Sequence, residues 1–234
     1  MTTGKEQYPA WKKSEWATPD AAYNAATENN AAFLKALAAC DAVLDKPSDI
    51  GWTPLMYAVH NGAKEAVAVL LETGVNPDQG KHGNGDDTPL MLAAESGRTD
   101  LMEMLIAAGA TVDKTNSYGV TALMTAAHWR EAEAARLLLE NGAKPNIQDK
   151  EGDTALTIAA DNSGDKVALV LLQKGADPSI KNKKGQTAQM LAEKRTNFHD
   201  GAKMILKHLK GSSREMKQRS LRGYLRGRGN GPSA

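Results

Sequence analysis

TALMTAAHWR, residues 121–130, is one of five versions of a single decapeptide that decides the fold of this chain. The other four are TPLMYAVHNG (53–62), TPLMLAAESG (88–97), TALTIAADNS (154–163) and TAQMLAEKRT (187–196). Successive copies begin 35, 33, 33 and 33 residues apart. Self-similarity at such a period is typical of a stacked repeat array, in which each unit buries its apolar face only against its neighbours. An array of this kind offers a long surface rather than a closed pocket, which favours binding a partner over transforming a substrate.

One unit of the array runs from Thr121 to residue 153. Thr121 suits a helix N-cap, because its hydroxyl accepts a hydrogen bond from a free backbone N–H of the first turn. The pattern predicts a short helix over residues 122–129 and a second, amphipathic helix over 131–142. Gly142 stands where a left-handed C-cap is expected. The turn-forming residues that follow predict a hairpin-like finger, and glycine precedes four of the threonines by two residues, at 51, 119, 152 and 185.

These residues resemble the ankyrin repeat, whose pattern opens with a Thr-Pro-Leu-His-like motif and closes with Gly-Ala. The resemblance extends from about residue 20 to residue 210. It implies an all-α fold, an ankyrin-repeat solenoid of helix-turn-helix units with projecting hairpin-like fingers. It also implies a concave face lined by the fingers and the first helices, and a function in protein binding with no shared catalytic residues.

Three departures from the family pattern stand out. Arg130 takes the place of a turn glycine, which costs roughly 1 kcal/mol if φ is positive there and suggests a use for the side chain. The 35-residue interval lengthens one finger, at QGKHGNGDD (79–87), and this loop is either a tolerated insertion or a contact loop. The usual histidine of the motif is replaced, so we expect packing instead of a hydrogen bond between neighbouring repeats. The replacing residues are Met56, Met91, Met124, Thr157 and Met190.

The chain divides into five parts by its pattern. We expect an aromatic N-terminal arm, an N-terminal capping repeat, four regular repeats, a C-terminal capping repeat and a basic flexible tail. Their ranges are 1–19, 20–52, 53–186, 187–210 and 211–234. The aromatic residues of the arm, Tyr8, Trp11 and Trp16, either pack back on the first helices or anchor in a partner.

The charge of the chain is unevenly distributed. From Lys203 onward there are nine basic residues and one acidic residue, whereas the remainder has 20 basic and 27 acidic residues and a net charge of −7. The tail therefore suits an anionic partner such as RNA, and its alternatives are a solubilising role, assembly with another protein, or docking on the acidic solenoid. The residues expected to contact an anionic partner are Arg214, Lys217, Arg219, Arg222, Arg226 and Arg228.

The residues expected to bind a protein partner are those that the packing of the repeats does not demand. They follow each finger glycine or lie on the exposed side of each first helix. Large aromatic side chains among them are natural hot spots, although each also suits a packing role between neighbouring helices. The set is Trp52, Tyr57, His60, Leu92, Glu95, Thr125, His128, Trp129, Asp153, Ile158 and Asp161.

Enzymatic chemistry finds no support in the sequence. The five histidines and the single cysteine have no metal-ligand spacing, and no phosphate-binding loop or nucleophile elbow occurs. We therefore expect no catalytic residues, no metal, no cofactor and no small-molecule substrate. No run of 18 apolar residues predicts a membrane span, and the N-terminal stretch lacks the apolar region of a secretory signal. We expect an intracellular protein, with the cytoplasm as first choice and an organelle left open.

Overall fold

The fold was obtained as a computed structural model, which describes residues 19–40, 42–80 and 85–195 and the single positions 205, 207 and 209. The described residues form helices joined by turns and loops. Residues 1–18 of the arm and the whole basic tail (211–234), with all six of its expected contact residues, lie outside the described residues. The helices are α2 (Pro19–Thr27), α3 (Ala31–Ala39), α4 (Pro54–Asn61), α5 (Lys64–Glu72), α6 (Pro89–Glu95), α7 (Thr99–Ala107), α8 (Ala122–Trp129), α9 (Ala132–Glu140), α10 (Ala155–Asp161), α11 (Asp165–Gln173) and α12 (Ala188–Arg195).

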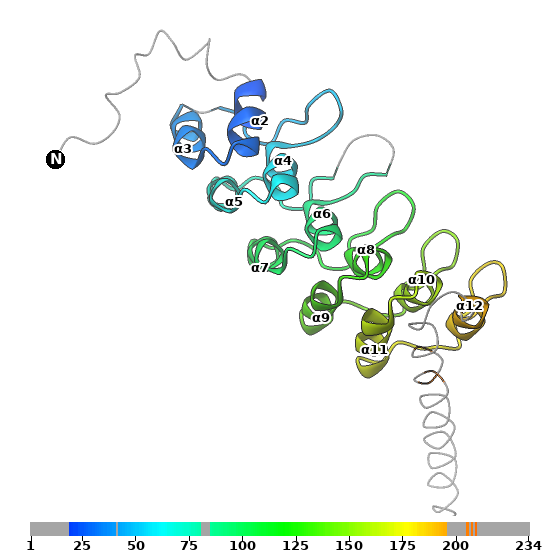
Figure 1. Ribbon diagram of the computed structural model, residues 1–234. Coiled ribbons are helices and arrows are strands. Elements are labelled where there is room, and N and C mark those ends of the chain that lie inside the picture. The colour runs from blue at the N-terminus through cyan, green and yellow to red at the C-terminus, as the bar shows by residue number, and fades with distance from the viewer. Residues whose placement is uncertain are drawn as a thin grey trace, which may run out of the picture.

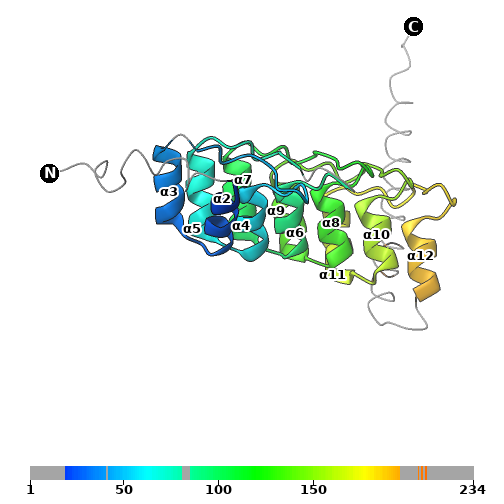
Figure 2. The same ribbon diagram turned by 90° about the horizontal axis from the view of Figure 1, so that it is seen from above.

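The helices stand in two rows. One row holds the first helix of each repeat (α2, α4, α6, α8, α10 and α12), and the other holds the second helices (α3, α5, α7, α9 and α11), as Figure 1 shows. Neighbouring helices of each row pack against each other, and each first helix from α2 to α10 packs against the second helix of its repeat. Figure 2 shows the helices side by side, with the connecting loops gathered at one end of them. The predicted all-α repeat array is therefore confirmed.

Each first helix from α4 to α10 begins at its motif threonine, as the sequence predicts. The hydroxyls of Thr53, Thr88, Thr121 and Thr154 accept hydrogen bonds from the backbone N–H three residues on, at N···O distances of 3.2 to 3.3 Å. These threonines are at most 3% exposed. The hydrogen bond satisfies an N–H that the helix itself leaves unpaired, and losing such a cap costs about 1 kcal/mol.

In each of the first five repeats, the turn between the two helices contains one residue with left-handed backbone geometry. These residues are Asn29, Gly62, Gly97, Arg130 and Ser163, with φ values of 56°, 71°, 63°, 64° and 57°. The positive φ of Arg130 confirms that it occupies a position suited to glycine. Asn29 has a second role, because its Oδ1 accepts the Ala66 N–H at 2.9 Å and so caps α5 of the next repeat.

The core lies between the two rows and repeats with the sequence. Each second helix contributes a buried leucine at an equivalent position of the repeat, at most 3% exposed, at positions 37, 70, 105, 138 and 171. The motif residues Met56, Met91, Met124 and Thr157 are also buried, at most 2% exposed, so packing does replace the usual histidine. The equivalent Met190 is 51% exposed, because α12 is the last first helix among the described residues.

The fingers are tied to one another by a repeating set of hydrogen bonds. Gly74, Gly109 and Gly142 follow the ends of α5, α7 and α9, and the side chain four residues after each of them accepts a hydrogen bond from a backbone N–H of the next finger. Asp78 accepts from Thr111 at 2.8 Å, Asp113 from Lys144 at 3.0 Å and Asn146 from Asp177 at 2.8 Å. The backbones of successive fingers also pair, for example from the Lys150 N–H to the Tyr118 carbonyl at 2.9 Å. The fingers therefore form one continuous edge with fixed spacing.

The finger glycines have the predicted geometry. Gly51, Gly119, Gly152 and Gly185 have φ values between 73° and 81°. In the lengthened finger the equivalent position is Asp86, whose φ is 51°. Residues 81–84 of that finger lie outside the described residues, so its role as insertion or contact loop stays a prediction.

Candidate functional site

The expected contact residues lie on what we call the first-helix face, the surface formed by the first-helix row and the fingers. Two depressions lie in this face, and the expected residues line them unequally: Tyr57 lines the first, and His128, Asp153, Ile158 and Asp161 line the second. The N-terminal hollow has a volume of about 470 Å³ and is lined by Asp20, Tyr23, Lys46, Pro47, Ser48, Asp49, Ile50 and Tyr57. The C-terminal hollow has a volume of about 180 Å³ and is lined by His128, Asp153, Thr157, Ile158, Asp161, Asn162, Asn182, Lys184, Gln186 and Leu191.

A cluster of rings adjoins the N-terminal hollow. The Tyr57 ring centroid lies 5.2 Å from that of Trp52 and 5.5 Å from that of Tyr23. Trp52 also meets His60 edge to face, with centroids 5.1 Å apart. Trp52 and Tyr57 are half-buried and His60 is exposed. The expected aromatic residues therefore support one another and still present ring surface to solvent.

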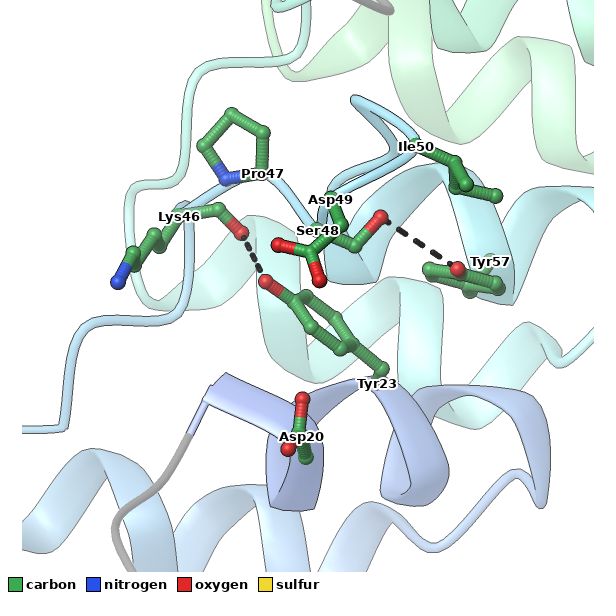
Figure 3. A pocket seen from close by; sticks show the side chains of 8 residues that line it. All are labelled: Asp20, Tyr23, Lys46, Pro47, Ser48, Asp49, Ile50 and Tyr57. Atoms are coloured by element: carbon green, nitrogen blue, oxygen red, sulfur yellow. Dashed lines mark hydrogen bonds between the residues drawn. The ribbon is translucent and has the colours of Figure 1, made fainter.

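The loop over the N-terminal hollow is held by two tyrosine hydroxyls. Tyr23 on α2 donates a hydrogen bond to the Lys46 carbonyl at 3.0 Å, and the Tyr57 hydroxyl lies 3.5 Å from Ser48 Oγ (Figure 3). Ser48 Oγ in turn accepts the Trp52 N–H at 3.2 Å. These contacts position the 46–50 loop across the junction between the first two repeats.

Tyr23 titrates abnormally because of its surroundings. Burial raises the pKa of Tyr23 above its ordinary value, and the carboxylates of Asp20 and Asp49 raise it further, with Tyr57 also contributing. Negative charge near a phenol disfavours the phenolate, so the two carboxylates favour the protonated form of Tyr23. The hollow thus combines aromatic walls with negative potential.

The polar groups of the C-terminal hollow are engaged with one another. Asp153 accepts a hydrogen bond from Asn182 Nδ2 at 2.9 Å, and Asp161 forms an ion pair with Arg195 at 3.1 Å. Asn162 Nδ2 lies 3.2 Å from both the Nδ1 and the carbonyl of His128. Asp153, Asp161 and His128 were all expected as partner contacts, and each is linked to the following repeat, so their role in partner binding stays a prediction.

The remaining expected residues are spread along the middle of the face. Leu92 is 8% exposed and belongs to the core, so it offers almost no surface to a partner. The Thr125 hydroxyl donates to the Thr121 carbonyl of its own helix at 3.1 Å. Glu95 and Ile158 are half-buried. Trp129 is 51% exposed and meets His128 edge to face, with centroids 5.6 Å apart.

Sequence reasoning missed Tyr23 and Asp49 as site residues. Tyr23 lies three residues after Asp20, as Met56 lies three residues after Thr53, so a tyrosine in the place of a core methionine was the available signal. No sequence pattern indicated Asp49, because its position near α2 depends on how the 46–50 loop folds.

Two negative findings apply to the described part of the chain. Within it, no group of three or more His, Cys, Asp or Glu side chains is arranged to hold a metal ion. None of its helices is long and apolar enough to cross a membrane.

Comparison with known proteins places these features in context. A family model described as "Ankyrin repeats (3 copies)" matches residues 12–81, 76–149 and 141–218. The chain is similar to glycerophosphocholine phosphodiesterase gde1 of Schizosaccharomyces pombe, with 41% identity over 70 residues, which cover 30% of this chain and 6% of that protein. It is also similar to the putative ankyrin repeat protein YahD of Escherichia coli K12, with 40% identity over 73 residues, covering 29% of this chain and 35% of that protein. The chain thus spans only a minor part of these relatives.

A solved structure matches a larger part of the chain. The crystal structure of an ankyrin repeat domain from Acinetobacter baumannii AYE superposes with a TM-score of 0.74 at 27% identity, covering 82% of this chain and 97% of that chain. The likeness extends over most of the helical array.

Proposed function

Because the chain belongs to the ankyrin repeat family, whose repeats are generally protein–protein interaction modules, we propose that it binds a protein partner through its first-helix face and fingers. In this proposal the chain acts without catalysis, as an adaptor or as a subunit of a larger assembly. The partner makes non-covalent contacts with side chains that several successive repeats present.

The observation that carries the proposal is the ring cluster of Trp52, Tyr57 and His60. Its members keep exposed ring surface although each ring centroid lies within 5.2 Å of another, so the cluster is held in place before a partner arrives. Aromatic side chains that are already ordered lose little conformational entropy on binding. Trp129 adds a second exposed aromatic, at 51% exposure, further along the same row.

Affinity capture with paired variants tests the proposal. The tagged chain is compared with a triple variant, Trp52→Ala, Tyr57→Ala and Trp129→Ala, in lysate of its own source organism. Val43→Ala is the matched control, because Val43 is 62% exposed but lies beside the ends of α3 and α5. Circular dichroism verifies that each variant retains its helix content.

The expected result is a protein captured by the chain and by the Val43 variant, but at least about tenfold less by the triple variant, a loss of about 1.4 kcal/mol or more in binding. The interaction is then reconstituted with that protein in purified form. Equal capture by a folded triple variant would contradict the proposal.

A second candidate function rests on the basic tail. Nine basic residues against one acid from Lys203 onward favour an anionic partner such as RNA. If about six of them met phosphates, affinity would fall ~10³-fold or more between 50 and 200 mM salt. Binding that is lost at high salt and on charge reversal of the tail, but kept in the triple variant, would favour this candidate over the first.

A further inference from the structure

We propose that the N-terminal hollow binds the side chain of an arginine in a basic segment of the partner protein, with the guanidinium held between the carboxylates of Asp20 and Asp49. The proposal rests on the protein-binding function proposed above and adds the chemistry that the partner must present. The proposed ligand is arginine rather than lysine, and it belongs to a separate protein rather than to the basic tail of this chain.

The two carboxylates are available to a cation. Asp20 and Asp49 are exposed, and no hydrogen bond or ion pair from another described residue engages either carboxylate. Both residues line the N-terminal hollow, Asp20 from α2 and Asp49 from the 46–50 loop. In the view of Figure 3 they lie on opposite sides of the Tyr23 ring.

Lys46, a cationic residue that lines the hollow, does not neutralise this site. Lys46 lines the hollow through its carbonyl, which accepts the Tyr23 hydrogen bond at 3.0 Å. Its ammonium points away from both carboxylates in Figure 3, and its side chain is exposed. The negative potential of the hollow is therefore left for a ligand, in a body of the chain whose net charge before Lys203 is −7.

The walls suit the rest of an arginine side chain. Pro47 and Ile50 form the apolar part of the rim, and Ile50 is 59% exposed. A long side chain with an apolar stem and a charged head covers such a surface with its methylene groups. Tyr57 adds a half-buried ring, and the face of an aromatic ring attracts a cation. A volume of about 470 Å³ leaves ample room for this group.

Arginine fits better than lysine for two reasons. Its planar guanidinium has five donors arranged in a fork, so it can engage two carboxylates at once and also stack on a tyrosine ring. A lysine ammonium is a compact, strongly hydrated charge that gains less from flat aromatic walls. The choice of one long cationic side chain follows from two acids and two rings meeting in one depression.

Nuclear magnetic resonance of the full-length chain labelled with ¹³C at its tyrosine rings tests the proposal. The chain has five tyrosines, so the spectrum is simple and Tyr118 on a distant finger serves as an internal control. The probe is the peptide acetyl-Gly-Ser-Arg-Ser-Gly-amide, with matched peptides in which lysine or citrulline replaces arginine. Citrulline keeps the shape of arginine and removes the charge.

The expected result is a saturable shift of the Tyr23 and Tyr57 signals with a dissociation constant of about 1 to 10 mM, a value suited to one side chain. Tyr118 does not respond, and the citrulline peptide binds at least about fivefold more weakly, the upper range for an exposed ion pair. Asp20→Asn and Asp49→Asn each weaken binding about threefold, and the double variant about tenfold. Glu103→Gln, which removes an exposed acid on α7, changes nothing.

Several outcomes would overturn the proposal. The absence of a saturable shift, or a shift that survives in the double variant, would show that the acids do not bind the probe. Equal binding of the lysine peptide would refute the choice of arginine. A movement of the Tyr23 signal on replacing Arg222, Arg226 and Arg228 by Ala in the full chain would show that its own tail occupies the hollow.

An experiment can separate an error in the arginine assignment from an error in the proposed protein-binding function. Capture of a partner that needs Trp52, Tyr57 and Trp129 but is indifferent to Asp20→Asn and Asp49→Asn would leave the first-helix face as the binding surface. Only the assignment of arginine to the hollow would then be lost.

Discussion

The two hollows of the first-helix face are built by the same elements and differ in what their acidic groups do. Each forms where neighbouring first helices meet a finger: α2 and α4 at the N-terminal hollow, and α8, α10 and α12 at the C-terminal hollow. At the C-terminal hollow the base of the finger is Asn182, which donates to Asp153 at 2.9 Å and ties two repeats together. At the N-terminal hollow the equivalent residue is Ser48, which accepts the Trp52 N–H and leaves Asp49 unengaged by described residues. The acidic groups of the C-terminal hollow are thus paired with other residues of the array, whereas Asp49 of the N-terminal hollow is paired with no described residue.

The fingers continue this contrast. The residue two before the finger glycine is Asp49 in the first finger and Lys150 and Lys183 in the last two, where the side chains are exposed. At this one position the side chain therefore changes from acidic in the first finger to basic in the last two. A partner that reads this face is expected to place its basic segment at the N-terminal end, because unlike charges guide and align an encounter.

Substitution of Asn182 gives the largest expected effect. Asn182 is 8% exposed, donates to Asp153, and accepts the N–H groups of Lys184 and Gln186 at 3.1 and 3.0 Å. Asn182→Ala removes these hydrogen bonds of a buried side chain, and we expect a loss of about 2 to 3 kcal/mol in the free energy of unfolding, measured in urea. Asp49→Ala, the matched change at the other hollow, should alter it by less than about 0.5 kcal/mol. Equal effects would erase the contrast between the hollows.

The hydroxyl of Tyr23 provides a second test, since it holds the loop over the available hollow. Tyr23→Phe removes the hydrogen bond to the Lys46 carbonyl and should lower the free energy of unfolding by about 1 kcal/mol. Tyr118→Phe, on an exposed finger tip, is the control and should leave it unchanged. An unaltered stability in Tyr23→Phe would mean that the loop is positioned by its other contacts alone.

The turns between paired helices also differ along the array, and Arg130→Gly measures the strain energy of a non-glycine residue there. The turns of the second and third repeats use Gly62 and Gly97, whereas the fourth and fifth use Arg130 and Ser163, all with positive φ. Because glycine adopts this geometry without strain, Arg130→Gly should raise the free energy of unfolding by about 0.5 to 1 kcal/mol. Lys144→Gly, outside such a turn, should not. A loss of stability would show that the Arg130 side chain makes a contact that outweighs the strain.

The smallest expected effect is on the titration of Tyr23. Burial is the main cause of its raised pKa, so the pKa should stay above the ordinary value in the Asp20→Asn and Asp49→Asn double variant, but move down toward it. The folded chain holds this proton more tightly than the unfolded chain, so stability from this group is complete below about pH 10 and falls as the pH rises beyond it. Tyrosine NMR across the alkaline range reads the pKa directly. An unchanged pKa in the double variant would separate the carboxylates from the hydroxyl.

Much of the fold was predictable, because it depends on local chemistry. The capping role of Thr121, the left-handed geometry at Arg130 and the positive φ at Gly152 follow from what each residue type does in a turn or a helix end. The replacement of histidine by buried methionine was also predictable, since Met56 and its equivalents recur at one position of the repeat.

The site was less predictable, because it depends on pairs far apart in sequence. Asp153 and Asp161 fit a list of exposed acids, but Asn182 and Arg195, 29 and 34 residues further on, engage them. The N-terminal hollow needs the 46–50 loop to fold over α2, and the periodic pattern carries no information on that loop. Periodicity thus identified the face, while tertiary contacts decide which of its groups are available.

The central claim, that a partner binds the first-helix face, is tested most directly by site-specific photo-crosslinking of the full chain in lysate. The crosslinker p-benzoylphenylalanine is placed at Ile50 or Thr125 on the face and, for comparison, at Glu72 or Glu103 on the second helices. The account predicts a discrete crosslinked protein from the first two positions and none from the others. Crosslinks from Glu72 or Glu103 alone would contradict it, because the partner would then lie on the opposite row of helices.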